Sequence, residues 1–260
     1  MTYRSTLICR LALGLTLAGL SACASTNTPQ KQGRSAEVHS AIAAQYVRRG
    51  ELDDAQRHAQ IALDAEPRDG DALTIMAVVL QREGSRLNLI KAEDFYKRAI
   101  AVTKGNDRAK AENNYAVFLS QQGRLEESLA LFESAGSTLG YAGRSASLEN
   151  LGRTALKLNR IEVAQRAFEG AIDADSGSLI ARVELVDIYL SQSQTARAAK
   201  LYNDYITLLG NNNMGARTLW QGIRIAQLRQ DSIELRRLGL LLTSSYPNSV
   251  EARRYALIPQ

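Results

Sequence analysis

The sequence predicts an all-α protein, a solenoid of about six antiparallel helix pairs that follows a short export segment. Three observations lead to this prediction. A pattern of small, aromatic and glycine residues returns about every 34 residues from Ala36 onward. Apolar residues make up 45% of the 260 positions and charged residues 23%, and good helix formers such as alanine, leucine and glutamate recur throughout. Only four prolines interrupt the chain, and Pro67 stands where a helix pair should end.

The N-terminus has the layout of a secretory signal. Met1–Arg10 is short and basic, and Leu11–Leu20 is an apolar run of ten residues, too short to span a bilayer. The following Leu20-Ser21-Ala22-Cys23 resembles the lipobox of bacterial lipoproteins. Small side chains there let a peptidase reach the backbone, and the thiol of Cys23 is the nucleophile that accepts the lipid. Residues 1–22 are therefore predicted to be a lipoprotein signal peptide, the alternative being an ordinary signal peptide with a chance cysteine.

The lipobox resemblance has consequences for anchoring. Cys9 would leave with the signal, so the mature chain would have no thiol free for a disulfide. The resemblance implies a covalent lipid with three acyl chains on Cys23, and we expect no other cofactor. Ala24 stands where an aspartate would favour retention, and by analogy with enterobacterial sorting this favours the outer membrane, with the protein facing the periplasm. The polar segment 23–35, with Pro29 and Gly33, is predicted to be a flexible tether to a repeat domain over 36–260.

The first repeat shows the spacing on which the fold prediction depends. Counted from Ala36 as position 1, its marked residues occupy positions 8, 11, 15, 20, 27 and 32: Ala43, Tyr46, Gly50, Ala55, Ala62 and Pro67. Small residues at 8, 20 and 27 let two helices approach closely, a large residue at 11 fills the groove between them, glycine at 15 opens the turn, and proline at 32 ends the second helix. The block resembles the tetratricopeptide repeat, and the resemblance implies a right-handed superhelical solenoid.

The register recurs along the rest of the chain. The repeats are expected near 36–69, 70–106, 109–142, 145–178, 179–212 and 216–249. The spacing in the second repeat predicts three residues inserted in its turn, near Arg86–Ile90. In the fifth repeat Val186 and Tyr205 replace small residues, which predicts looser packing, and in the sixth Gln230 stands at the turn in place of glycine. Residues 250–260 have room for one last helical turn before Pro259.

In such arrays, first-helix side chains at positions 2, 5, 9, 12 and 13 line a concave binding face. The predicted protein-binding groove comprises 13 residues: Glu37, Ser40, Val47, Arg48, Thr74, Val78, Arg82, Asn113, Val117, Gln121, Glu149, Arg153 and Leu156. Their mixture of apolar and polar groups suits an extended or helical peptide with several apolar anchors. The alternative for any single one of them is a merely solvated side chain.

Catalytic and metal-binding patterns are missing from the sequence. HExxH, CxxC, GxSxG and the phosphate-loop pattern do not occur, so the chain is not expected to be an enzyme or to take a small-molecule substrate. His39 and His58 are expected to approach each other across the first hairpin, but without a third ligand we expect no metal site. Removal of residues 1–22 lowers the formal net charge from +5 to +3, which is too small and too mixed to favour nucleic acid.

Two stretches carry a closer resemblance. Asn113–Leu119 (NNYAVFL) followed by Gln122-Gly123-Arg124, and Leu219–Ile225 (LWQGIRI) with Tyr246–Ala252 (YPNSVEA), resemble the third and last repeats of the PilF/PilW family of type IV pilus lipoproteins. Two departures stand out: Ser120 replaces a cysteine common in the family, and Gln230-Asp231 replaces Gly-Asp.

The resemblance implies a pilotin, which binds the secretin subunit in the periplasm and promotes its outer-membrane localisation and multimerisation. Its expected partners are that secretin and, through the acyl anchor, the outer-membrane bilayer. The alternative is a general periplasmic scaffold lipoprotein for outer-membrane or cell-wall assembly.

Overall fold

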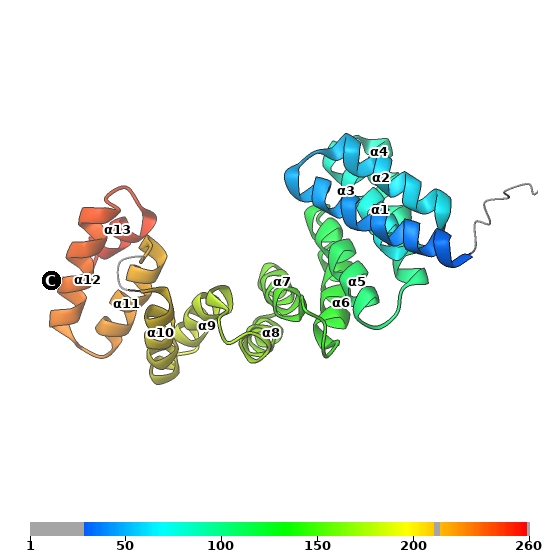
Figure 1. The fold of residues 1–260 in the computed structure, drawn as a ribbon. Coiled ribbons are helices and arrows are strands. Elements are labelled where there is room, and N and C mark those ends of the chain that lie inside the picture. Colours follow the sequence, from blue (N-terminus) through cyan, green and yellow to red (C-terminus); the bar gives the residue numbers. More distant parts are fainter. Residues whose placement is uncertain (1–28, 211–213, 259–260) are drawn as a thin grey trace, which may run out of the picture.

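In a computed structural model, which describes residues 29–210 and 214–258, all regular elements are α-helices. They follow one another along a curved array, from α1–α4 at one end to α11–α13 at the other (Figure 1). The all-α solenoid predicted from the sequence is confirmed. In chain order the helices are α1 (Pro29–Arg49), α2 (Leu52–Ala65), α3 (Gly70–Glu83), α4 (Arg86–Val102), α5 (Gly105–Gln121), α6 (Leu125–Ser137), α7 (Arg144–Lys157), α8 (Ile161–Ala174), α9 (Leu179–Ser191), α10 (Thr195–Leu209), α11 (Ala216–Leu228), α12 (Ser232–Ser245) and α13 (Val250–Tyr255).

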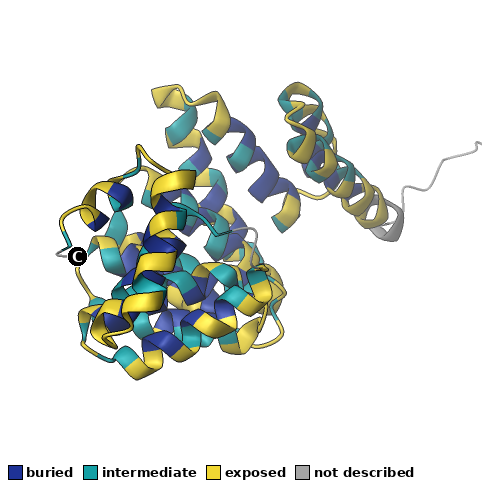
Figure 2. Cartoon of the chain, turned by 90° about the vertical axis from the view of Figure 1, so that its left-hand side faces the viewer, coloured by how far each residue is buried: buried dark blue, intermediate teal, exposed yellow. Residues whose placement is uncertain are grey.

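Small residues allow the two helices of each pair to pack closely. Ala43, Ala55 and Ala62 of the first pair are completely buried. In the fourth pair, a methyl group at Gly152 would lie 2.6 Å from ring carbons of Phe168, so only glycine fits against that ring. Buried and exposed residues therefore alternate around each helix, and the buried side faces the neighbouring helices (Figure 2).

Short polar side chains start several of the helices. Asp69 accepts a hydrogen bond from the backbone N–H of Ala72 at the start of α3, and Ser85 does the same for Asn88 at the start of α4. Such caps satisfy backbone donors that have no partner inside the helix. At these helices the caps fix the residue at which the helix begins.

The turns inside the pairs differ between the two halves of the array. Gly50, Gly84 and Gly123 have φ of +80°, +73° and +77° in the first three pairs. The corresponding residues of the last three pairs are Asn159, Ser193 and Gln230, which have φ of +56°, +59° and +58°. All six turns thus use the left-handed conformation, but only the first three have glycine, the residue that adopts it most readily, at that position.

The structure corrects two expectations about segment boundaries. Helix α1 begins at Pro29, so residues 29–35 of the expected tether are helical; proline is well suited to a first helical turn, and Gly33 is not enough to break the helix. The inserted residues of the second repeat do not lengthen its turn. Ser85 caps α4 directly after α3, and the extra residues extend α4 to 17 residues, against 14 in α2.

The expected loosening at Val186 and Tyr205 is not found at those side chains. Val186 is fully buried, and the Tyr205 hydroxyl lies 3.2 Å from the Thr218 hydroxyl. The apolar core nevertheless divides beyond this point, because α11–α13 enclose a cluster of their own. Its buried members are Leu219, Ile223, Leu238, Leu242, Ala252 and Tyr255. The last helical turn expected in 250–260 is present as α13.

Candidate partner-binding groove

A groove runs along the face formed by α1, α3 and α5, the first helices of the first three pairs. It consists of two adjoining cavities of 540 and 350 Å³ that share Val78, Arg82 and Asn114. We call this the N-terminal groove. Nine of the 13 residues selected from the sequence line it: Glu37, Ser40, Val47, Arg48, Thr74, Val78, Arg82, Val117 and Gln121.

The larger cavity has an apolar lining. Ala41, Ala44 and Val47 come from α1, and Ile75 and Val78 from α3. All but Ile75 keep part of their surface open to solvent. Partly exposed aliphatic groups in a hollow suit the side chains of a peptide, because burying them on both partners removes apolar surface from water.

Two buried hydroxyl groups of the groove have partners within the protein. The Ser40 hydroxyl donates to Asp69 Oδ2 at 3.0 Å, and the Thr74 hydroxyl donates to the carbonyl oxygen of Gly70 at 2.8 Å. Both side chains are at most 6% exposed. The Ser40 bond ties α1 to the start of α3, and the Thr74 bond lies within the first turn of α3, so neither hydroxyl is left to meet a ligand.

Some charged side chains at the rim of the groove have a partner within the protein, and others have none among the described residues. Arg82 Nη1 donates to the carbonyl oxygen of Val47 at 2.8 Å, and Lys110 pairs with Asp71 at 2.8 Å. Glu37 and Arg48 are exposed, and neither side chain has a partner among the described residues. These two side chains of α1 are free to bind charges of a partner.

The smaller cavity contains a chain of hydrogen bonds between three helices. The Tyr96 hydroxyl on α4 donates to Gln81 Oε1 at 2.6 Å, and Gln81 Nε2 donates to Gln121 Oε1 at 2.7 Å. Burial raises the pKa of Tyr96 above its usual range, so its hydroxyl stays protonated. The chain presents amide and hydroxyl groups beside the apolar surface of Val117.

Three of the groove residues that the sequence-based selection missed share a repeat position. Ala41, Ile75 and Asn114 line the groove and all occupy position 6 of their repeats. Position 6 lies one helical turn before position 9, on the same face of the helix. Helical periodicity alone would therefore have identified these three residues as part of the groove.

The other four selected residues lie outside the groove. Asn113 Oδ1 accepts from the Ser147 hydroxyl at 2.9 Å, and Glu149 Oε1 accepts from the Ser178 hydroxyl at 2.6 Å. Arg153 is exposed, and Leu156 packs on the central core. The structure thus does not bring these side chains together with the first nine.

Farther along the same face, first helices are joined by ion pairs. Arg217 on α11 donates to Glu184 and Asp187 on α9, with N–O distances of 2.7 and 2.8 Å. Arg224 lies 3.7 Å from Asp187. The hydrogen bonds to Glu184 and then Asp187 raise the pKa of Arg217 further above its usual range. We call these four residues the C-terminal ion cluster.

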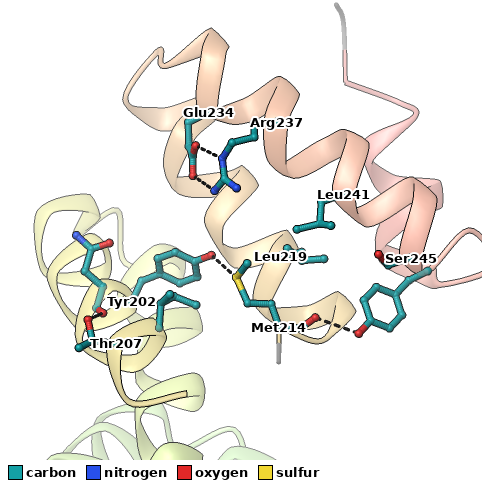
Figure 3. Close-up of a pocket in the computed structure, with 11 residues that line it drawn as sticks. Tyr202, Thr207, Met214, Leu219, Glu234, Arg237, Leu241 and Ser245 are labelled. Atoms are coloured by element: carbon teal, nitrogen blue, oxygen red, sulfur yellow. Dashed lines mark hydrogen bonds and ion pairs between the residues drawn. The ribbon is translucent and has the colours of Figure 1, made fainter. Parts of the chain in front are cut away.

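A third cavity, of 970 Å³, lies between the second helices α10 and α12 (Figure 3). Tyr202 Oη points to Met214 Sδ at 3.9 Å, and Tyr246 Oη donates to the Met214 carbonyl at 3.0 Å. Glu234 and Arg237 close one side with two hydrogen bonds of 2.7 Å. No feature of the sequence pointed to this cavity.

The two histidines meet as expected. His39 Nδ1 and His58 Nδ1 lie 2.9 Å apart, and the Tyr46 ring stacks on His58 with centroids 5.5 Å apart. Burial, with the nearby His39 and Arg57, lowers the pKa of His58. Among the described residues no group of three or more His, Cys, Asp or Glu side chains is placed to hold a metal ion.

Cys23 lies outside the described residues, as do the expected signal peptide, residues 1–22, and residues 24–28 of the expected tether. No helix in the described ranges is long and apolar enough to cross a membrane.

Comparison with known proteins gives concordant matches. A tetratricopeptide-repeat family model matches residues 150–213. The chain is 30% identical over 259 residues to the type IV pilus assembly protein PilF of Pseudomonas aeruginosa, and the match covers 98% of each chain. The solved structure of P. aeruginosa PilF matches with a TM-score of 0.74 and 27% identity, covering 87% of this chain and 98% of that one. PilW, a type IV pilus biogenesis factor, matches with a TM-score of 0.63 at 21% identity over 85% of this chain and 98% of its own, which shows the common fold.

Proposed function

This chain belongs to the family of the type IV pilus assembly protein PilF, and on that premise we propose that it is a pilotin, which binds the secretin subunit of the pilus machinery and brings it to the outer membrane. Family membership makes it a tetratricopeptide-repeat protein of type IV pilus biogenesis. The identity of the partner and the place where the two meet are the parts we propose.

The N-terminal groove is the observation that carries the proposal. A segment of the secretin would lie across α1, α3 and α5, with an aliphatic side chain over Val47, Ile75 and Val78. Glu37 and Arg48 would meet charges on that segment, since neither has a partner among the described residues. The groove needs no chemistry to do this, and binding alone would be enough for the role.

The second half of the proposal is the anchor. The lipobox ending at Cys23 supports a covalent lipid, and Ala24 supports sorting to the outer membrane, where the repeats would face the periplasm. A partner held in the groove would then be carried to the membrane together with the lipid.

A Cys23→Ala substitution separates the two halves. The variant should stay soluble in the periplasm, still capture the secretin from detergent-solubilised envelopes, and leave secretin multimers depleted from the outer-membrane fraction. Cys9→Ala, inside the expected signal peptide, is the matched control and should change none of these. Fractionation of the Cys23→Ala protein with outer membranes in cells lacking the secretin would refute the anchor.

The same capture experiment tests the partner. Recovery of the secretin would support the pilotin role. Recovery of barrel-assembly or cell-wall proteins without a secretin would instead favour the general scaffold expected as the alternative.

A further inference from the structure

Charge is distributed unevenly along the repeats. Residues 214–260 contain seven arginines, no lysine and three acidic residues, a formal net charge of +4. Residues 36–213 carry 21 basic and 24 acidic residues, a net charge of −3. The last pair and α13 therefore form a basic unit at the end of an acidic array.

Only some of these arginines have partners. Arg217 and Arg224 belong to the C-terminal ion cluster, and Arg237 pairs with Glu234. Three others, Arg229, Arg236 and Arg254, are exposed, and none of their side chains has a partner among the described residues. The surplus positive charge of the unit thus faces solvent.

Aliphatic side chains are exposed beside these arginines. Ile233 and Leu240 on α12 are 82% and 64% exposed, and their spacing of seven residues, with Arg236 between them, places all three on one face of the helix. The opposite face of α12 buries Leu238 and Leu242 in the core of the unit. Helix α12 is therefore apolar on two sides, and only one of them is explained by packing.

Further exposed groups belong to the same C-terminal unit. Leu228, which is 54% exposed, and Arg229 stand at the turn that leads into α12. Helix α13 packs against Gly239, where a methyl group would overlap the Tyr255 ring, and it is followed by Leu257, which is 83% exposed. None of the cavities described above is lined by Ile233, Arg236 or Leu240.

We infer that the outer face of α12, with Arg229, Arg236 and Arg254, docks on the surface of an anionic phospholipid membrane. Exposed aliphatic groups between unpaired arginines are what an interfacial helix uses: the aliphatic groups enter the boundary of the acyl chains, and the arginines meet lipid phosphates. The complementary charge selects an anionic surface over a neutral one. The inference does not depend on the N-terminal groove or on a secretin partner.

Vesicle co-sedimentation tests this inference without the lipid anchor. The protein is residues 23–260 with Cys23→Ser, and the vesicles are phosphatidylethanolamine with a quarter phosphatidylglycerol, or phosphatidylcholine alone. We expect partition onto the anionic vesicles, weakened by salt, and little onto the neutral ones. The triple variant Arg229→Glu, Arg236→Glu, Arg254→Glu should lower the partition coefficient about a hundredfold, since each arginine near the surface contributes about a factor of five.

A matched triple variant controls for overall charge. Arg49, Arg86 and Arg166 are also exposed, and their side chains have no partner among the described residues. Their conversion to glutamate changes the net charge equally and should leave partition within about threefold, because these residues lie outside the basic unit. Circular dichroism and thermal melting establish that both variants are folded.

Three outcomes would overturn the inference. The first is equal partition of the parent onto anionic and neutral vesicles. The second is an equal loss in the two triple variants. The third is absence of vesicle binding together with salt-sensitive binding to polyglutamate, which would assign the surface to an acidic protein. A double variant, Ile233→Ser with Leu240→Ser, should weaken partition even at low salt if the aliphatic groups enter the membrane.

Discussion

The first-helix face has two different characters along its length. At α1 and α3, positions 6 and 9 of the repeat are Ala41 with Ala44 and Ile75 with Val78, and a cavity of 540 Å³ lies over them. At α9 the same positions are Glu184 and Asp187, and both are held by Arg217 of α11. One half of the face has apolar groups left open for a partner, and the other half has charges that bind each other.

This difference shows how a repeat protein can assign two tasks to the same positions. Small and aliphatic residues leave a hollow because they do not reach across to the next repeat. Longer charged residues reach across and join adjacent repeats. We therefore expect the N-terminal half of the first-helix face to bind a partner and its C-terminal half to hold adjacent repeats together.

The largest expected effect is on partner binding, when a charged residue like those of the C-terminal ion cluster is placed in the N-terminal groove. Val78→Arg would fill the shared part of the groove with a guanidinium group, and we expect capture of the partner to fall at least hundredfold, or about 3 kcal/mol. Binding is measured by pull-down from solubilised envelopes at graded protein concentration. Ile180→Arg, on the same face of α9, is the control and should bind normally. Normal capture by Val78→Arg would place the binding site elsewhere.

A smaller effect is expected from breaking the C-terminal ion cluster. Glu184 is 16% exposed and Arg217 is 45% exposed, so the pair is only partly shielded from water. Glu184→Arg should lower the free energy of unfolding by about 1–2 kcal/mol, because Arg217 then faces a like charge. Urea denaturation measures the change. The swap of both residues, Glu184→Arg with Arg217→Glu, should recover most of it, and no recovery would mean that the pair does not join α9 to α11. Partner capture should be unchanged in both.

The smallest effect concerns pH and should appear only in the N-terminal half, because His39 and His58 are the only two histidines. The pKa of His58 is lowered in the folded protein, so the unfolded chain takes up the proton first as pH falls. The contribution of this group to stability is full above its ordinary value of about 6.5 and is lost as pH falls through the lowered value. Amide hydrogen exchange, corrected for intrinsic rate, should speed up in α1 and α2 between pH 7 and pH 5.5. His58→Gln should abolish that change, and an equal change in α11 and α12 would contradict it.

Much of the architecture could be predicted because the same packing and turn positions recur in each repeat. The small residues at positions 8, 20 and 27 set close helix packing, and the turn position shows where each pair folds back. What the register could not show is how far a helix extends. The start of α1 at Pro29 and the longer α4 depend on capping and on the absence of strong helix breakers, which leave no trace in the 34-residue spacing.

The candidate site was predicted in part for a similar reason. Positions known to face a partner identified nine residues of the N-terminal groove, whereas position 6 was missed. The C-terminal ion cluster was missed as well, although Arg217 stands 33 residues after Glu184 and 30 after Asp187, close to one repeat length. A search for opposite charges one repeat apart would have found it.

The left-handed turns of the last three pairs have a practical consequence for protein engineering. Ser193 and Gln230 occupy a backbone conformation that costs a residue with a side chain about 1 kcal/mol or more, and glycine escapes that cost at the expense of some chain entropy. Substitution of either residue by glycine should therefore raise the stability of the protein. Both turns are far in sequence from the N-terminal groove. These turns are the first positions to substitute for a more stable version for crystallography or for screening of groove partners, because neither lines the N-terminal groove.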